Sequence, residues 1–299
     1  MLTRVQRARM ATDTVPTLVD PDWLAARLDA PDLRVVDCTV HLTVRSGTGD
    51  YRLDSGEDDW RAGHVPGSVF ADLIEELSET EDPAYPLQLP SPAVFASGME
   101  RLGIGDDTRV VVYDAAGEHS RNMWAARLWW LLRVFGHDRV GVLDGGWERW
   151  VGEDRPVESG AAEPTPEVEF TPAFRPELVA DRDEVADRAG AGDACVINAL
   201  RPADHAAERV PGSVNVPAVG EEAIVDTGTG SYLPPSELRE RFEAAGATDA
   251  DRVITYCGAG VAASSAALGL HLAGVEDAAV YDGSLSEWLE AEGTAVATD

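Results

Sequence analysis

A cysteine at the start of a glycine-containing loop is the residue of this chain best suited to covalent chemistry. Cys257 follows the apolar run 253–256, and a helical pattern of small residues then continues to about Ala273. A thiol at a helix N-terminus faces unpaired backbone N–H groups and the positive end of the helix dipole, which lower its pKa from about 8.5 to between about 3.5 and 7.5. We therefore expect an ionised nucleophile, reachable from solvent and cradled by the loop residues Gly258, Ala259, Gly260, Val261 and Ala262.

The other two cysteines lack such a loop. We interpret Cys38 and Cys195 as buried structural thiols, and a buried inert thiol is also the alternative interpretation of Cys257. Three cysteines are an odd number in a chain of 299 residues, which is long enough to be stable without disulfides, so a reducing compartment is favoured. Residues 1–14 contain arginines but no following apolar stretch, so they do not read as an export signal. We expect a cytoplasmic protein.

Three sequence landmarks occur twice in the same order. The paired segments are separated by 138 to 145 positions: residues 65–69 match 210–214, residues 107–114 match 251–257, and residues 144–150 match 282–288. A period of this length is too long for a solenoid, so it indicates two copies of one domain. We predict these domains over residues 16–158 and 177–299, joined by a proline-rich linker at 159–176.

Short valine-rich runs alternate with helical patterns in each copy. Runs such as 110–113 and 253–256 have the continuous apolar character of strands that are buried on both faces. The clearest helix is expected over residues 121–135, ended by Gly136, with its tryptophans packed in the core and between the domains. The predicted fold class is α/β: two tandem domains, each a mainly parallel sheet with helices on both faces.

Ligands of open parallel sheets bind at the carboxyl ends of the strands, and the two copies differ at this position. The second copy has Cys257 directly after its strand, whereas the first copy has Asp114. One copy therefore has the nucleophile and the other does not.

The charge balance excludes two classes of partner. The chain has 54 acidic and 24 basic residues, a formal net charge of −30, and no lysine. Nucleic acid and anionic membranes both require clustered cations, so neither is expected as a partner. Screening at about 1 M salt, where the Debye length is about 3 Å, would suppress the self-repulsion of this surface. We predict a salt-loving cytoplasm, with an acidic protein of an ordinary cell as the alternative.

The uncharged stretch 253–275 could be mistaken for a membrane span. It contains glycines, two serines and a histidine, which fit a buried strand followed by a helix packed closely on a sheet. We predict that second arrangement.

Five motifs carry a resemblance to a known family: residues 63–72, 112–114, 135–137, 143–146 and 256–261. Taken in this order they resemble the two-domain rhodaneses, which comprise thiosulfate and 3-mercaptopyruvate sulfurtransferases, and the resemblance extends from about Thr17 to the C-terminus. It implies an inactive first copy, with Asp114 at the place of the nucleophile, and a catalytic second copy in which Cys257 carries a persulfide. It also implies a small anionic sulfur donor and a thiol or cyanide acceptor. Two half-reactions through a covalent intermediate predict ping-pong kinetics.

The loop departs from the pattern of this family. Gly258 and Ala259 carry no charge, whereas thiosulfate-type members usually place basic residues directly after the cysteine. The mercaptopyruvate-type sequence Cys-Gly-Ser-Gly-Val-Thr is closer, but its serine is Ala259 here. The aspartate and histidine that are thought to work with this serine match Asp72 and Leu87, so only the aspartate is present. Water or substrate would have to replace this proton relay.

The arginine-bearing insertion that usually grips the donor is also missing. Arg201 and Arg209 are the nearest substitutes, because a guanidinium binds a carboxylate with two parallel hydrogen bonds. Their alternative role is to offset the nearby Asp204 and Glu208 at the surface.

Two further functions are compared with the enzyme. Rhodanese-related phosphatases place an arginine six residues after the cysteine to clamp phosphate, and Ala263 stands there, so phosphatase activity is disfavoured. A persulfide carrier or regulatory module, which loads once without turnover, remains open. The sequence contains no metal-ligand cluster and no dinucleotide fingerprint, so we expect no cofactor and no metal, and the oligomeric state is left open.

Overall fold

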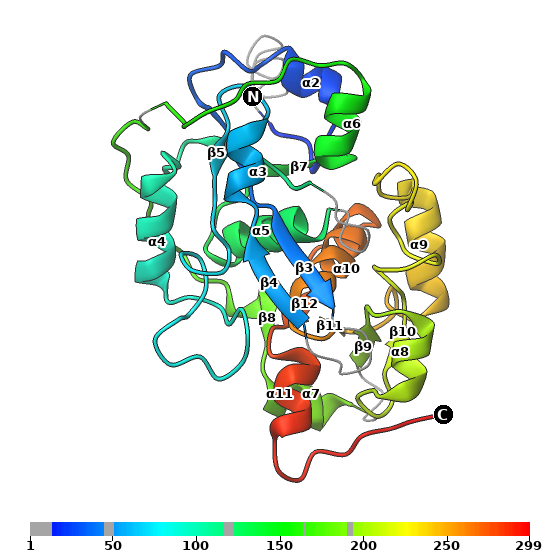
Figure 1. Ribbon diagram of the computed structural model, residues 1–299. Helices are drawn as coiled ribbons and strands as arrows, with labels where there is room; N and C mark the ends of the chain where they lie inside the picture. The colour runs from blue at the N-terminus through cyan, green and yellow to red at the C-terminus, as the bar shows by residue number, and fades with distance from the viewer. Residues whose placement is uncertain (1–13, 45–50, 116–121, 164, 190–193) are drawn as a thin grey trace, which may run out of the picture.

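Each half of the chain contains a five-stranded parallel sheet (Figure 1). The computed structural model describes residues 14–44, 51–115, 122–163, 165–189 and 194–299. The strand order is β5-β2-β6-β7-β1 in the first sheet and β10-β9-β11-β12-β8 in the second, so equivalent strands take equivalent places. The first sheet comprises β1 (Leu18–Val19), β2 (Leu33–Asp37), β5 (Val69–Phe70), β6 (Arg109–Tyr113) and β7 (Val140–Leu143). The second comprises β8 (Val179–Ala180), β9 (Ala194–Asn198), β10 (Val214–Asn215), β11 (Arg252–Tyr256) and β12 (Ala279–Tyr281).

The two halves repeat a hydrogen bond at the ends of their central strands. The Tyr113 phenol, at the end of β6, accepts from the Val65 amide at 3.2 Å. The Tyr256 phenol, at the end of β11, accepts from the Val210 amide at 3.0 Å. The repeated Val-Pro-Gly-Ser-Val segments therefore serve the same purpose in both sheets. The α/β fold with two tandem copies is confirmed.

Helices flank both sheets, and several begin at a capping side chain. Ser91 and Asp181 accept from the backbone N–H three residues on, which satisfies an amide that a helix start otherwise leaves unpaired. The helices of the first half are α2 (Pro21–Ala25), α3 (Glu57–Ala62), α4 (Pro92–Arg101), α5 (Met123–Val134) and α6 (Gly146–Gly152). Those of the second half are the 3₁₀ turn η1 (Pro176–Leu178) and α7 (Arg182–Arg188), α8 (Pro202–Ala207), α9 (Pro235–Ala244), α10 (Val261–Leu272) and α11 (Ser284–Glu290).

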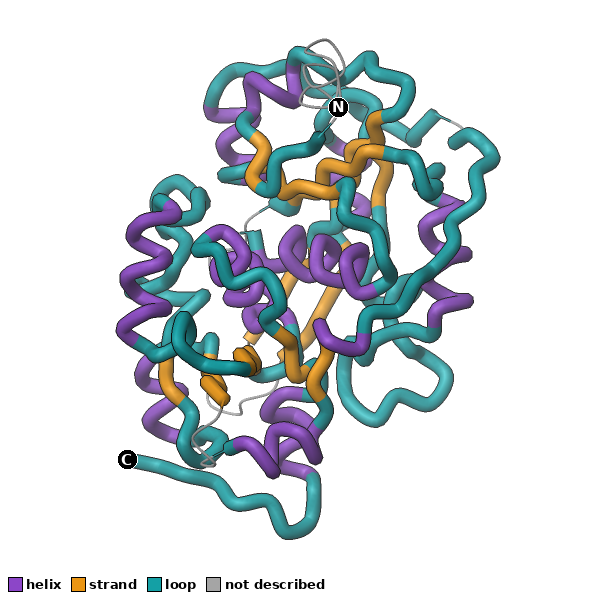
Figure 2. Tube along the Cα trace, turned by 180° about the vertical axis from the view of Figure 1, so that it is seen from behind, coloured by secondary structure: helices purple, strands orange, loops and turns teal. Residues whose placement is uncertain are grey.

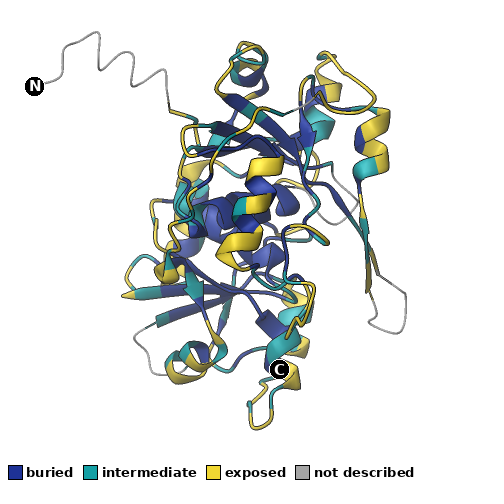
Figure 3. Cartoon of the chain, turned by 90° about the vertical axis from the view of Figure 1, so that its left-hand side faces the viewer, coloured by how far each residue is buried: buried dark blue, intermediate teal, exposed yellow. Residues whose placement is uncertain are grey.

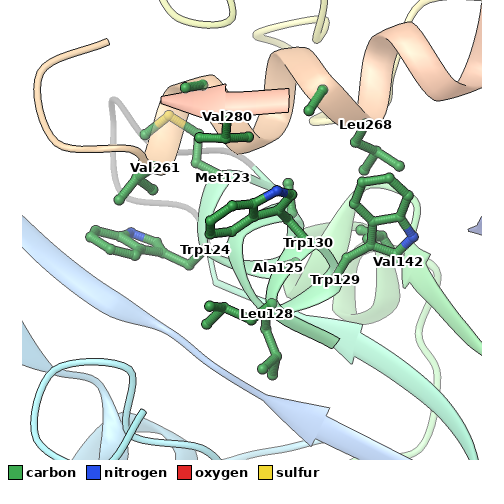
Figure 4. Packing of buried hydrophobic residues seen from close by; sticks show 14 of the residues in the cluster. Met123, Trp124, Ala125, Leu128, Trp129, Trp130, Val142, Val261, Leu268 and Val280 are labelled. Atoms are coloured by element: carbon green, nitrogen blue, oxygen red, sulfur yellow. The ribbon is translucent and has the colours of Figure 1, made fainter. Parts of the chain in front are cut away.

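Helices α5 and α10 pack against each other where the two halves meet (Figures 1 and 2). Helix α5 is the helix predicted over residues 121–135, although Arg121 lies outside the described residues. Figure 4 shows its tryptophans, Trp124, Trp129 and Trp130, in the cluster that also contains Val261 and Leu268 of α10. All three tryptophans are at most 2% exposed, so the prediction that they pack in the core and between the halves is confirmed.

The uncharged stretch 253–275 forms strand β11 followed by helix α10, as predicted. Within the described ranges, no helix combines the length and apolar character needed to cross a bilayer.

The segment predicted as a linker is held along the first half. The amides of Ala173 and Arg175 donate to the carbonyls of Phe135 and Val134 at 2.9 and 2.8 Å. Phe170 is buried, with its ring centroid 5.6 Å from that of Phe95. These contacts make the segment an ordered strap instead of a loose tether.

A two-stranded antiparallel hairpin, which the sequence did not predict, projects from the first half. It comprises β3 (Val40–Val44) and β4 (Tyr51–Ser55). Figures 1 and 3 show it reaching away from the first sheet toward the second half. The hairpin brings Tyr51 of the first half close enough to interact with Ser286 and Cys257 of the second half.

Candidate active site

Cys257 is the first residue after strand β11, at the carboxyl end of the second sheet. Three residues later Gly260 takes a left-handed conformation (φ 76°) and leads into helix α10. A side chain at Gly260 would be strained by this φ, and its Cβ would lie 2.8 Å from Oδ1 of Asp282. The strand, the tight loop and the helix thus place the thiol at the start of α10, as the sequence predicted.

The surroundings of the sulfur differ in two respects from the expectation. Cys257 is only 2% exposed, because it belongs to the apolar cluster formed by the two halves. The amides of Cys257 and Gly260 both donate to the Ser284 hydroxyl at 3.1 Å, and this hydroxyl lies 4.0 Å from the Cys257 sulfur. These two loop amides therefore face a serine that stands beside the sulfur. The expectations of a freely accessible thiol and of these amides on the sulfur were wrong.

Ser284 belongs to a turn that is hydrogen-bonded to the Cys257 loop. Its backbone is left-handed (φ 50°), and its hydroxyl donates to the Tyr281 carbonyl at 2.8 Å. The next two amides, of Leu285 and Ser286, donate to the carbonyls of Cys257 and Gly258 at 3.0 and 2.9 Å. Sequence reasoning used residues 282–288 only as a repeated landmark and missed this role. The repeat itself was the available signal.

The first half shows what the same arrangement of helix amides can bind. The Asp114 carboxylate accepts from the amides of Asn122, Trp124 and Ala125 at 3.0, 2.8 and 3.0 Å. Burial raises the pKa of Asp114 to about 7, whereas these amide bonds act in the opposite direction. The start of helix α5 is therefore an anion-binding arrangement that is filled by the protein's own side chain.

The corresponding amides of the second half are not used in this way. Asn122 and Gly260 are both left-handed residues directly before their helices, so Trp124 and Ala125 correspond to Ala262 and Ala263. In the part of the chain that the structure describes, no acceptor is recorded for the amides of Ala262 and Ala263. Two donors at the start of the helix that follows Cys257 are thus available to a further anion.

Arg127 and Asp282 bring the first half up to this loop. Arg127 on α5 and Asp282, directly after β12, form a buried ion pair of 2.5 Å. A Cβ on Gly260 would lie 3.0 Å from Nη1 of Arg127. These two residues are 155 positions apart, and no local pattern in the sequence could have paired them.

Tyr51 also comes from the first half, on strand β4 of the hairpin. Burial raises the pKa of Tyr51, a hydrogen bond with Ser286 lowers it, and the charge of Cys257 raises it again. The side chain is 43% exposed. A phenol therefore stands near the rim of the site, and the sequence gave no indication of it because the hairpin itself was not predicted.

The predicted substrate arginines are engaged elsewhere. Arg201 pairs with Asp204 at 2.7 Å, and Arg209 pairs with Asp299 at 2.7 Å. Among the described contacts, neither guanidinium touches the Cys257 loop.

The two positions matched to the family's relay have local roles. Asp72 accepts from the amides of Ile74 and Glu75 at 2.8 and 2.9 Å. The carbonyl of Leu87 accepts from Arg127 at 2.7 Å.

The other cysteines are buried beside carbonyl oxygens. The Cys38 thiol donates to the Tyr113 carbonyl at 3.4 Å, and the Cys195 thiol donates to the Ala245 carbonyl at 3.3 Å. Burial raises the pKa of Cys38 well above its usual range and that of Cys195 to about 11. Their surroundings are those of structural thiols. Across the described ranges, no three side chains of His, Cys, Asp or Glu are grouped to hold a metal ion.

Comparison with known proteins places these features in a family. The rhodanese-like domain matches residues 20–153 and 181–291. The chain is 34% identical to 3-mercaptopyruvate sulfurtransferase of Escherichia coli K12, over 90% of this chain and 94% of that protein. It is 35% identical to thiosulfate sulfurtransferase of Rattus norvegicus, over 91% of each.

The fold comparison agrees with the sequence comparison. The crystal structure of SseA from Escherichia coli, described as a 3-mercaptopyruvate sulfotransferase with the rhodanese fold, matches with a TM-score of 0.76. The match is 33% identical and covers 90% of this chain and 99% of that one. The chain therefore belongs to the rhodanese-like family, as a sulfurtransferase built from two copies of the domain.

Proposed function

We propose that Cys257 carries the transferred sulfur as a persulfide. The thiolate attacks the sulfane sulfur of thiosulfate or the thiol sulfur of 3-mercaptopyruvate, and a new S–S bond forms. The S–S bond of thiosulfate or the C–S bond of 3-mercaptopyruvate breaks, and its electron pair leaves with sulfite or with the enolate of pyruvate, which then takes up a proton. An acceptor thiolate or cyanide attacks the outer sulfur and returns Cys257 to the thiolate.

The available amides of Ala262 and Ala263 are the observation that carries this proposal. Their counterparts in the first half hold the Asp114 carboxylate, so the start of α10 has the donors to hold an anionic sulfur. The Ser284 hydroxyl lies 4.0 Å from the Cys257 sulfur and holds the amides of Cys257 and Gly260, which fixes the loop beside these donors. This set of donors favours an extra sulfur atom with negative charge at the position next to Cys257.

The donor is thiosulfate or 3-mercaptopyruvate. The relatives named above include enzymes named for each. The cation beside the loop, Arg127, is neutralised by Asp282, so it does not favour the dianion thiosulfate. Gly258 and Ala259 add no charge. The loop therefore offers backbone N–H groups to the sulfur donor, and these suit either molecule.

Intact-mass measurement tests the persulfide. The protein is incubated with thiosulfate or 3-mercaptopyruvate in high salt, freed of donor, and weighed. We expect the mass of one added sulfur atom on the wild type and none on Cys257→Ser, with Cys38→Ser and Cys195→Ser as matched controls that still load. A Cys257→Ser variant that gains sulfur would overturn the assignment.

A persulfide carrier is the second candidate. The burial of Cys257 and the engagement of Arg201 and Arg209 with acidic partners favour it, because a carrier needs neither fast donor access nor a substrate clamp. Turnover separates the two functions. Repeated thiocyanate formation from cyanide and a small donor supports the enzyme, whereas a single loading that only a protein acceptor discharges supports the carrier.

Arg201 and Arg209 can be tested as donor-binding residues. Each is changed to Gln, with Arg61→Gln as the control because Arg61 forms a similar exposed pair with Glu57 in the first half. A donor-binding arginine raises the KM for the donor without a matching change for the acceptor. An unchanged KM assigns the residue to its surface ion pair.

We also propose a reducing, cytoplasmic setting for this chemistry. All three cysteines are free, and a persulfide enzyme requires its nucleophile in the thiol state.

A further inference from the structure

The buried ion pair of Arg127 and Asp282 crosses from one half of the chain to the other. Arg127 lies on α5 of the first half, and Asp282 follows β12 of the second. Their side chains are 3% and 2% exposed, and Nη1 of Arg127 lies 2.5 Å from Oδ1 of Asp282. Two charges at this depth are stable only when their remaining donors and acceptors are also satisfied.

Further groups of the first half complete the pair. Nη2 of Arg127 donates to the Leu87 carbonyl at 2.7 Å, where the left-handed backbone of Leu87 (φ 57°) directs the carbonyl inward. Oδ2 of Asp282 accepts from the Leu89 amide at 2.7 Å and from the Tyr85 phenol at 3.3 Å. Asp282 is thus held from two directions by elements that belong to the inactive copy.

Asp282 leads directly into the turn that supports the nucleophile. Two residues later the Ser284 hydroxyl accepts from the amides of Cys257 and Gly260. A connected series of contacts therefore runs from α5 through Asp282 to the catalytic loop. A displacement of Asp282 moves Ser284, and with it the Cys257 loop, whose amides Ser284 holds.

The other half provides an internal comparison. Asp144 is the counterpart of Asp282, and it accepts from the Tyr232 amide at 3.1 Å as Asp282 accepts from Leu89. Its cation is Arg149 of the same half, and its side chain is 18% exposed. The helix position that corresponds to Arg127 is Ser265, which bonds the Tyr232 phenol. Among the described residues, the buried ion pair between the halves accompanies the copy with the cysteine and not the copy with Asp114.

We infer that Arg127 is a positioning residue for sulfur transfer, through which the inactive copy fixes the Ser284 turn beside Cys257. The inference rests on the proposed role of Cys257 as the sulfur carrier. It gives the first copy a part in the reaction. Helix α5 of the first copy supplies the forked Arg127 guanidinium that holds Asp282, and the second copy supplies the nucleophile. Lysine cannot replace this fork, because an ammonium does not reach the Asp282 carboxylate and the Leu87 carbonyl with the same planar geometry.

Arg127→Lys tests the inference because it keeps the charge and removes the fork. The matched control is Arg149→Lys, which makes the same change in the ion pair of Asp144. We expect both variants to fold with wild-type circular dichroism. Arg127→Lys should lower kcat by about 10- to 100-fold, since a small misplacement of reacting groups has effects of this size, with little change in the KM for the donor. Arg149→Lys should keep wild-type kcat.

A second measurement does not depend on sulfur transfer. The rate at which iodoacetamide alkylates Cys257 is followed by peptide mass spectrometry as a function of pH, for the wild type and both variants. We expect the midpoint of this profile to rise in Arg127→Lys, because a displaced Ser284 turn lets the Cys257 loop move away from the amides at the start of α10, and to stay unchanged in Arg149→Lys. Asp282→Asn separates positioning from charge. Loss of its negative charge alone would lower the midpoint, whereas a displaced turn raises it.

Two results would overturn the inference: a wild-type kcat and alkylation profile in Arg127→Lys, or equal effects of Arg127→Lys and Arg149→Lys. If Arg127→Lys does not fold, the alkylation profile of Asp282→Asn gives the same test. A midpoint above that of the wild type supports positioning, and a midpoint below it contradicts positioning. A wild type that never gains sulfur would refute the proposed function, and the alkylation profiles would still show whether Arg127 positions the thiol.

Discussion

Asp114 and Cys257 stand at the same position of the two sheets, each as the first residue after the central strand, and only Asp114 is held by the amides of its helix. The Asp114 carboxylate accepts three amide bonds at the start of α5. In the second half the Cys257 sulfur lies 4.0 Å from the Ser284 hydroxyl. The amides of Ala262 and Ala263, at the start of α10, have no acceptor among the residues that the structure describes. One copy thus contains its own anion, and the other can accept one.

Gly260→Ala should damage the catalytic loop, whereas Gly258→Ala should be tolerated. The φ of Gly260 is 76°, and a Cβ there meets Asp282 at 2.8 Å, so we expect a loss of roughly 1 to 3 kcal/mol in the free energy of unfolding and loss of sulfur loading. A Cβ on Gly258 meets nothing within 4 Å, so its unfolding free energy should change by at most about 0.5 kcal/mol. Urea unfolding of both variants checks this. Equal losses in the two variants would contradict the role of Gly260.

Asp114 should make the protein less stable as the pH rises. Burial raises its folded pKa to about 7, above the ordinary value of 3.8, so its contribution to stability is fully present below about pH 4 and is lost as the pH rises through 7. Asp114→Asn does not titrate. We therefore expect the unfolding free energy of the wild type minus that of Asp114→Asn to fall by up to about 4 kcal/mol between pH 4 and 8. Urea titrations across this range measure the difference, and a constant or rising difference would refute the ionisation proposed here.

Cys257 should be the thiol that reacts fastest in the folded protein. The thiols of Cys38 and Cys195 donate to carbonyl oxygens, and burial raises the pKa of both, so little thiolate is present at neutral pH. Brief treatment with iodoacetamide at pH 7.5, followed by peptide mass spectrometry, should label Cys257 at least about tenfold faster than either. Labelling after unfolding is the control, where all three should react alike. Equal rates in the folded state would make Cys257 an ordinary buried thiol.

Added salt should stabilise the protein. The net charge of −30 is spread over a chain without lysine, and screening reduces the mutual repulsion of its carboxylates. We expect the midpoint of thermal unfolding to rise between about 0.1 and 1 M NaCl, over which the Debye length falls from about 10 to about 3 Å. Sucrose at equal osmolality controls for effects that do not depend on charge. A midpoint that falls with NaCl would contradict the prediction of a salt-loving protein.

The sequence predicted those features that depend on local pattern or on repetition. The landmark pairs located the equivalent strands β6 and β11, and the apolar run before Cys257 placed the thiol at the carboxyl end of the second sheet. The helix around Trp124 was predicted for the same reason, because apolar side chains recur at helical spacing. These predictions needed no knowledge of how the two halves meet.

The features that were missed depend on contacts across the chain. The Ser284 hydroxyl reaches the amide of Cys257 only because β12 lies beside β11, and the left-handed conformation of Ser284 has no signature in its residue type. Arg127 and Asp282 are paired by the packing of the two halves. The alternation pattern of β3 and β4 was too weak to predict the hairpin that carries Tyr51.

The strap that joins the two halves is part of the first half as much as a connection between them. Its backbone is hydrogen-bonded to Phe135 and Val134, and Phe170 is buried in the first half, so the second half begins only a few residues after a fixed point. Cys257 is almost fully covered. Gly258 and Ala259 are half-buried and are more exposed than Cys257 itself, so we expect a donor to approach the thiol from their side of the loop.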